Sequence, residues 1–409
     1  MAPSSSIQQI LLSPAELSYL HTSLSQTPPI RPDARSATQF RPLLAEFDIL
    51  PGTNGSARIC FADGTEAIVG VKAEVEKSPK IYGDERTAAE AEDIEDDEND
   101  LQEQEQESAR FESCWVELTV EIPGFRDDDA MPVFLAALLS EALLADRELT
   151  RRLWINRRFH WKLFIDVSPS MPCNDIRDWS LKFKNRQILL LSTPLSYPLP
   201  LLSLTAHLAL LSTRLPRLKS ELDEDPLFDD DWDASVFLYP RAGGGGSSSS
   251  NSRSGKSEVR PPITLLVISV GDNIIFDPSR EELAVAEVVL AVSVGKQVPR
   301  RHAEAVDIDG DFEQGYWHLK LLAVRTIDPP SRLTPLGLPN FLNSATGGTA
   351  EMATPGMDVQ RNGKEMEGVW QTRRGGARRK MIGAMVGKVL QSGGVAQEVF
   401  DGLDGVDLG

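Results

Sequence analysis

The sequence has few of the residues on which disulfide-rich and metal-binding proteins depend. Its three cysteines, Cys60, Cys114 and Cys173, are odd in number and lie far apart, so they give neither a disulfide framework nor a zinc site. The five histidines show no metal-ligand spacing. This cysteine usage is typical of a reducing compartment, and we expect no metal ion or other cofactor.

Long apolar runs are also scarce. The N-terminus lacks a basic region followed by a continuous apolar core, so no secretory signal is predicted. Residues 188–213 carry no charged side chain, but Pro194, Pro198 and Pro200 would break a membrane-spanning helix early. We interpret this stretch as a strand end, a turn and a buried helix from about residue 200 to 215, with no role at a membrane.

The sequence has fewer positively charged than negatively charged residues. The formal net charge is −19, and residues 84–107 alone hold thirteen Asp or Glu against one Arg. Most of the acidity is therefore one local run, and the remainder is mildly acidic, which disfavours a strong autonomous nucleic-acid binder. Because the run is poor in large apolar residues, we predict an acidic disordered loop over 84–109.

The clearest structural signal is a strand pattern. Ala57, Ile59 and Phe61 alternate with polar or small residues, and Asp63-Gly64 is a typical hairpin turn. Strands are predicted over 40–50, 56–62, 65–75, 114–122, 161–166, 263–270, 273–276, 287–294 and 317–326. Helices are predicted over 13–24, where Ser13 and Glu16 can form a capping box, and over 131–149, 200–215 and 378–390.

Two segments interrupt this pattern. Residues 167–187 are a polar stretch inside an otherwise apolar strand. The stretch begins with Val167, whose codons begin GT, and ends with Gln187, whose codon can end AG, so we hypothesise that it is a retained intron. The alternative is a genuine surface insertion. Residues 243–257 are a Gly/Ser-rich linker. The expected organisation is an N-terminal helical extension, a first domain, an acidic and then Gly/Ser-rich linker, a second domain and a tail, over 1–32, 33–220, 221–258, 259–395 and 396–409.

Several ordered motifs resemble those of the RNase PH family. They are Arg-Pro-Asp-Ala-Arg-Ser at 31–36, Glu-Phe-Asp at 46–48, Gly-Ser-Ala-Arg at 55–58, Gly-Val-Lys-Ala-Glu at 70–74 and Asp-Pro-Ser-Arg-Glu-Glu at 277–282. The fourth motif resembles the eukaryotic RNA exosome ring subunit that is related to the non-catalytic archaeal subunit. Ala34 and Phe47 depart from the family pattern, and if Ala34 adopts a positive φ it is strained by about 1 kcal/mol or more.

The resemblance implies an α+β fold of two RNase PH-like halves, about 33–220 and 259–395, each packing β-sheet against helices. It also implies a structural subunit of the hexameric exosome ring, in the nucleus, nucleolus and cytoplasm. The implied partners are other RNase PH-like ring subunits, cap subunits and a separate catalytic exoribonuclease. RNA would pass through the assembled channel for 3'→5' processing and degradation, including rRNA maturation.

The same resemblance predicts that the chain is not an enzyme. Active relatives hold phosphate with a Gly-Thr-Arg segment and carry a carboxylate after the Glu-Glu pair of the second half. Here residues 191–196 read Leu-Ser-Thr-Pro-Leu-Ser, and Leu283, Val288 and Val289 provide no carboxylate. The rival interpretation is a phosphate-dependent 3'→5' exoribonuclease. Glu281 and Glu282, adjacent in sequence, are interpreted as solvated or structural rather than as paired acid–base groups.

A basic, aromatic stretch at 151–161 is the one candidate RNA contact. Arginines between aromatic side chains suit phosphate pairing and base stacking. The candidate RNA-binding residues are Arg151, Arg152, Arg157 and Arg158. The alternative is that Trp154 and Trp161 belong to the core and that the arginines form a solvated turn or ion pairs. No catalytic and no metal-binding residue is predicted.

Overall fold

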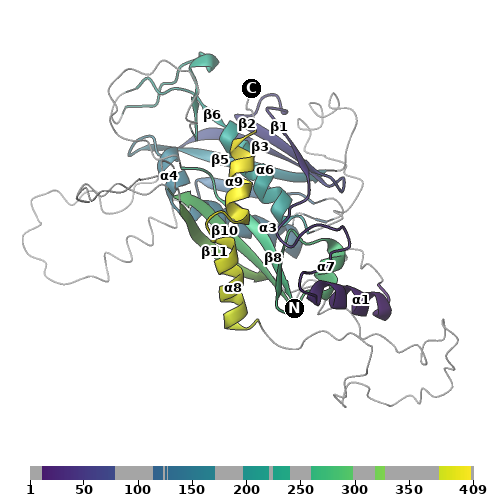
Figure 1. The fold of residues 1–409 in the computed structure, drawn as a ribbon. Coiled ribbons are helices and arrows are strands. Elements are labelled where there is room, and N and C mark those ends of the chain that lie inside the picture. Colours follow the sequence, from purple (N-terminus) through teal and green to yellow (C-terminus); the bar gives the residue numbers. More distant parts are fainter. Residues whose placement is uncertain are drawn as a thin grey trace, which may run out of the picture.

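The computed structural model describes residues 12–78, 114–122, 125–126, 128–170, 197–220, 224–239, 259–297, 318–327 and 377–406. Figure 1 shows two β-sheets that lie on either side of a central helix. The mixed α+β class expected from the sequence is confirmed, because both sheets pack against helices.

The first sheet has five strands in the order β1-β2-β3-β5-β4. Their bounds are Leu43–Phe47 for β1, Gly55–Phe61 for β2, Glu66–Lys77 for β3, Val116–Val120 for β4 and Phe159–Ser170 for β5. Neighbouring strands are antiparallel except for β4 and β5, which are parallel. The predicted alternation in β2 is confirmed, since Ala57, Ile59 and Phe61 are all buried.

The second sheet has four antiparallel strands in the order β11-β10-β8-β9. They span Ile263–Val270 for β8, Asn273–Phe276 for β9, Val288–Gln297 for β10 and His318–Ile327 for β11. Every residue of β8 is buried, as expected for a strand that is covered on both faces. A two-stranded ribbon of β6, Arg214–Leu215, and β7, Val236–Phe237, stands apart from both sheets.

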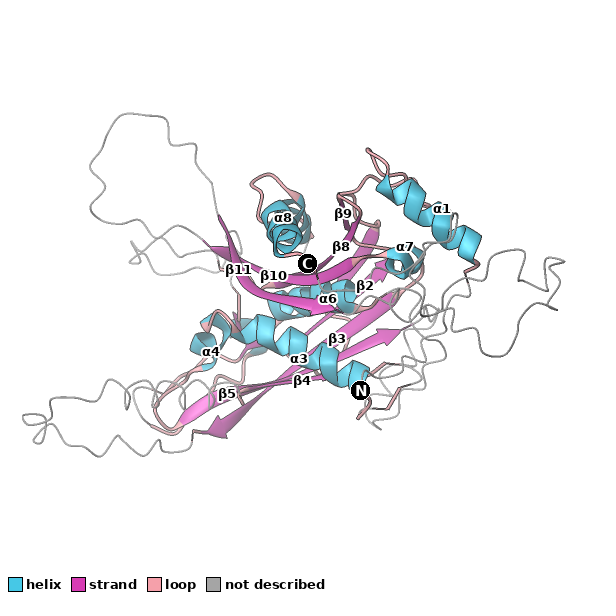
Figure 2. Cartoon of the chain, turned by 90° about the horizontal axis from the view of Figure 1, so that it is seen from below, coloured by secondary structure: helices cyan, strands magenta, loops and turns pink. Residues whose placement is uncertain are grey.

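The helices and sheets form alternating layers. The view in Figure 2 shows α8, the four-stranded sheet, the pair α3 and α6, and then the five-stranded sheet. The longer helices are α1, Pro14–Ser25, α3, Ala130–Leu144, α6, Leu199–Ser212, α8, Arg379–Val389, and α9, Val395–Asp404. Shorter ones are α4, Glu148–Leu153, α7, Arg280–Val285, and the 3₁₀ turn η3, Trp232–Ala234. Because α6 lies between the sheets, thirteen of its residues are buried and its apolar character extends all round.

Several local predictions are confirmed. Helix α1 begins with the predicted capping box, in which Glu16 N–H donates to Ser13 Oγ at 3.3 Å and Ser13 N–H donates to Glu16 Oε2 at 2.7 Å. Gly64 of the predicted hairpin turn has a φ of 84°. The helix expected over 131–149 ends instead at Leu144, because Arg147 takes a left-handed conformation with a φ of 50° and starts α4.

The motif at 277–282 lies between β9 and β10, and helix α7 begins there, capped by Ser279. Two features differ from the sequence-based expectation. Residues 396–409 were expected to be a tail, but α9 extends to Asp404 and buries Phe400 in the core. Strand β5 continues past residue 166 to Ser170, and Val167 is buried. The expected acidic loop at 84–109 and residues 171–187 of the suspected insertion lie outside the described residues.

Candidate functional site

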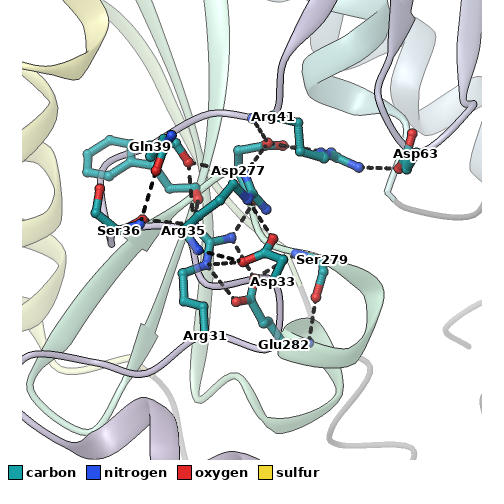
Figure 3. A network of polar contacts seen from close by, with 11 residues as sticks. Arg31, Asp33, Arg35, Ser36, Gln39, Arg41, Asp63, Asp277, Ser279 and Glu282 are labelled. Atoms are coloured by element: carbon teal, nitrogen blue, oxygen red, sulfur yellow. Dashed lines mark hydrogen bonds and ion pairs between the residues drawn. The ribbon is translucent and has the colours of Figure 1, made fainter.

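Two of the motifs that carry the family resemblance, at 31–36 and 277–282, contact each other, although about 250 residues separate them in sequence. Arg31 donates from Nε to Glu282 Oε1 at 2.7 Å and from Nη2 to Glu282 Oε2 at 2.8 Å. Both side chains are fully buried. Arg31 also donates to the backbone carbonyls of Phe276 and Asp277, at 3.2 and 2.9 Å. This bidentate pair fixes the N-terminal segment against the end of β9 and the start of α7 (Figure 3).

A second buried carboxylate, Asp277, lies beside this pair. Arg41 donates to it from Nε at 2.9 Å, from Nη2 at 2.6 Å and from its backbone N–H at 2.9 Å. Arg35 adds a bond from Nη1 at 2.8 Å and also pairs with Asp33. The remaining guanidinium nitrogen of Arg41, Nη1, donates to Asp63 Oδ2 in the hairpin turn between β2 and β3. We call the residues Arg31, Asp33, Arg35, Arg41, Asp63, Asp277 and Glu282 the junction network.

Within the junction network, the arginines and the carboxylates pair with one another. Burial alone would raise the pKa of Asp277, but the hydrogen bonds and charge of Arg41, with further charge from Arg35, hold that pKa below its usual value. Desolvation likewise opposes the charge on Arg41, yet its contacts with Asp277 and Asp63 raise its pKa. The three arginines face four carboxylates, so no spare positive charge is left for a phosphate. The network can join two parts of the fold, but it is not built to hold an anionic substrate.

Backbone strain accompanies the network. Ala34 has a φ of 60° and Asp277 a φ of 45°, in the left-handed region that side chains with a Cβ rarely adopt. The strain expected at Ala34 from its departure from the family motif is therefore present. Both residues lie beside arginines of the network, whose bonds hold the backbone in place.

The residues that the family resemblance assigned to the catalytic positions are apolar. Leu283 and Val289 are buried in the core, and Val288 packs against it. Glu282 is buried in its pair with Arg31 whereas Glu281 is exposed, so the two carboxylates do not act together and the structural interpretation of Glu282 is confirmed. Residues 191–196, at the place of the family's phosphate-binding segment, lie outside the described residues.

The four candidate RNA-binding arginines lie on α4 and in the turn before β5. Arg152 pairs with Glu148 at 3.1 Å, donates to the carbonyl of Leu238 at 2.8 Å and stacks over Tyr239. Arg158 pairs with Asp225 at 2.9 Å. Arg151 lies 3.9 Å from Glu148 with its side chain 68% exposed, and Arg157 is exposed.

The two tryptophans of this stretch differ in environment. Trp161 is buried in the core, and its ring packs at a tilt of 44° against that of Phe228, with ring centroids 4.9 Å apart. Trp154 is 56% exposed. The suggestion that both belong to the core is therefore wrong for Trp154, because it lies at the end of α4 and only the residues of β5 itself enter the sheet.

A cavity of about 720 Å³ lies between the loop that joins β1 to β2 and the β6–β7 ribbon. Its wall includes Phe47, Asp48, Arg214, Trp232 and Phe237. Arg214 stacks over the Phe237 ring at 4.4 Å. Sequence reasoning missed this cavity, because the residues that form it come from three separate segments.

Within the part of the chain that the structure describes, no group of three His, Cys, Asp or Glu residues is placed to hold a metal ion. Among those same residues, no helix is long and apolar enough to cross a membrane. Sequence reasoning also missed the junction network. The signal for it was present, since both motifs are rich in charged residues, but nothing local indicated that they pair.

No family model matches the chain. It is 30% identical over 288 residues to "Exosome complex component RRP42" of Saccharomyces cerevisiae; the matched region covers 69% of this chain and 81% of that protein. It is also 30% identical over 315 residues to "Exosome complex component rrp42" of Schizosaccharomyces pombe, covering 74% and 84%.

Among solved structures, the chain is similar to the Archaeoglobus fulgidus exosome with RNA bound to the active site. The TM-score is 0.41 and the identity 16%, over 76% of this chain and 87% of that one. Rice Rrp46 matches with a TM-score of 0.33 and 11% identity, over 73% and 85%.

Proposed function

The chain belongs to the Rrp42 family of exosome complex components, and from this we propose that it is a non-catalytic structural subunit of the exosome ring. The observation that carries the non-catalytic part is the environment of Leu283 and Val289. Where the family resemblance places a catalytic carboxylate, both residues are buried apolar side chains. A carboxylate introduced there would be desolvated, so these positions serve the core rather than acid or metal chemistry.

The proposal includes the two-half architecture. The five-stranded sheet with α3 and α6 forms the first RNase PH-like half, over 33–220, and the four-stranded sheet with α8 forms the second, over 259–395, which α9 extends to Asp404. The junction network supports this view, because it couples the motif at 31–36 to the motif at 277–282. A subunit that contributes walls to a ring needs its halves held in one fixed relation, and the buried bidentate pair provides this.

The partners that we propose are other RNase PH-like ring subunits, cap subunits and a separate catalytic exoribonuclease. RNA would pass through the assembled channel for rRNA maturation and RNA decay in the nucleus, nucleolus and cytoplasm. In this arrangement the chain itself needs no strong affinity for RNA, which agrees with its net charge of −19.

Native purification of the tagged chain, followed by mass spectrometry, tests the proposal. We expect several other RNase PH-like subunits in one large particle. Recovery of the chain alone, or as a homo-hexamer, would contradict it. A purified wild-type chain that releases nucleoside diphosphates from RNA only when phosphate is added would favour the rival, a phosphate-dependent exoribonuclease.

We also propose that RNA contact at the 151–158 stretch is confined to its exposed part. Arg152 is half-buried, pairs with Glu148 and stacks over Tyr239, whereas Arg151, Arg157 and Arg158 have exposed side chains and are the residues able to reach a phosphate. In the assembled particle, Arg151→Glu with Arg157→Glu should lower RNA crosslinking to this peptide, whereas Arg379→Glu, an exposed control on α8, should not. Equal crosslinking in all three particles would refute this contact.

A further inference from the structure

A projecting ribbon near the edge of the first sheet has features of a docking surface. We call it the acidic arm: β6, β7 and the described residues between them, which are 214–220 and 224–237. The ribbon extends outward beside β6 in Figure 1. Its two sides are joined by backbone bonds, from Lys219 N–H to the Leu227 carbonyl at 2.8 Å and from Asp229 N–H to the Arg217 carbonyl at 2.9 Å. The arm therefore has a defined shape without a partner.

The end of the acidic arm that lies away from β6 and β7 is held by the rest of the chain. Phe228 packs on Trp161 of β5, and Asn156 donates from Nδ2 to the Glu224 carbonyl at 3.0 Å. Asp225 pairs with Arg158. These contacts limit the freedom that a partner would have to remove on binding, which is favourable for a preformed interface.

Large apolar side chains on the acidic arm face solvent. The exposed fractions are 40% for Leu218, 64% for Leu227, 47% for Trp232 and 55% for Val236. Single exposed apolar residues are normal on a protein surface, but here four lie on one short ribbon. Trp232 and Phe237 also line the cavity of about 720 Å³ described above, so the half-exposed ring of Trp232 borders a hollow.

The polar residues around Trp232 are acidic. Residues 224–235 contain six carboxylates and no Lys or Arg, whereas on the facing side of the arm Arg217 and Lys219 flank Leu218, and Lys219 pairs with Asp229 at 2.9 Å. Trp232 follows Asp230 and Asp231 and precedes Asp233, and all four side chains are exposed. An exposed Trp next to carboxylates suits a positively charged partner, because Lys or Arg can pair with the carboxylates and also lie over the indole face.

We propose that the acidic arm docks another protein subunit of the same particle, one whose surface offers an apolar pocket rimmed by Lys and Arg. Trp232 is the anchor that enters this pocket. RNA does not fit, because the carboxylates around Trp232 repel phosphate. A small molecule in the cavity would leave Leu227 and Val236 uncovered. The identity of the partner as an exosome subunit rests on the proposed function.

The test uses the tagged full-length chain expressed in cells, with a photo-crosslinking amino acid at position 232. We expect the crosslink to join residue 232 to a peptide rich in Lys or Arg on one other exosome subunit. In parallel, the variant Trp232→Ala with Leu227→Ala should lower recovery of that subunit by tenfold or more, as expected for a central aromatic anchor. Tyr19→Ala, which removes a 72% exposed aromatic ring on α1, is the matched control and should change nothing.

The charge requirement is tested separately. Asp230→Lys with Asp233→Lys keeps Trp232 but reverses the local charge, and it should lower recovery of the same subunit at physiological salt. Crosslinks from position 232 to RNA, to a basic segment of this same chain, or to no protein at all would overturn the inference. So would unchanged recovery with both variants. If the wild-type chain brings down no exosome subunit, the proposed function itself fails, and this outcome is visible before any variant is compared.

Discussion

The buried pair of Arg31 and Glu282 gives the sharpest test of the fold. The change is Arg31→Met, which keeps much of the apolar stem but removes the guanidinium. Glu282 would then remain fully buried with its charge unpaired, keeping only the bond from Ser279 N–H at 2.7 Å. Removing one partner of a buried pair costs about 3–5 kcal/mol, so we expect a loss of that size in the free energy of unfolding.

Urea unfolding followed by tryptophan fluorescence measures this loss as a shift of the midpoint at an unchanged slope. The matched control is Arg325→Met. Arg325 pairs with Glu141 at the same distance of 2.8 Å, but the two side chains are 59% and 39% exposed. An exposed pair contributes far less to stability than a buried one, because water screens it, so the control should be several times milder.

A double-mutant cycle separates pairing from other effects. Glu282→Gln removes the charge and can keep the capping bond at the start of α7, because Gln also serves at this position. Combined with Arg31→Met, it leaves no unpaired charge, so the double variant should be more stable than the sum of the single losses predicts by at least about 2 kcal/mol. Simple additivity, or a loss for Arg31→Met as small as that for Arg325→Met, would refute the reasoning.

Three further predictions concern single sites and use the same unfolding assay. Ala34→Gly should stabilise the protein by about 0.5 kcal/mol. Relief of the backbone strain at a φ of 60° stabilises the folded chain by about 1–2 kcal/mol, and the extra freedom of Gly in the unfolded chain costs about 0.4–1 kcal/mol. A destabilised variant would show that the position is not strained. Gly55→Ala should lower the free energy of unfolding by about 1–3 kcal/mol, since the new Cβ would lie 2.6 Å from Thr213 Cα. In the control Gly383→Ala, in α8, the new Cβ meets nothing within 4 Å, so this variant should be neutral or stabilising. Equal effects of the two variants would contradict this. Burial lowers the pKa of His207 to about 4, against the nearby Asp404 carboxylate, which raises it. The unfolded chain therefore binds more protons between pH 6.5 and 4, so stability is fully present above pH 6.5 and falls by about 3 kcal/mol as the pH drops to about 4. His207→Leu should flatten that part of the pH profile, and an unchanged profile would refute the assignment.

Local features of the fold followed from the sequence because short-range chemistry determines them. The alternation of Ala57, Ile59 and Phe61 predicted a strand with one buried face, and the Asp63-Gly64 dipeptide predicted the turn after it. The capping box at Ser13 and the bounds of β8 and β9 are of the same kind. The positive φ at Ala34 could also be anticipated from one departure in a motif.

Only the tertiary structure decided what the charged residues do. Nothing local distinguishes Glu281, which is exposed, from Glu282, which is buried against an arginine 251 positions away. The same holds for Arg152 and Arg158, whose distant partners are the Leu238 carbonyl and Asp225, and for Trp154, which the sequence pattern could not separate from Trp161.

The physical reason is the range of the interactions. Hydrogen bonds within a turn or a helix end involve residues a few positions apart, so the sequence by itself determined the strands, the turn and the caps of this protein. Burial of a charge or of an aromatic ring depends on which distant segments pack around it. The role of each charged residue of this chain therefore depends on how α6 and the two sheets pack together. That packing decides whether the residue faces solvent, joins the two sheets or lines a docking surface.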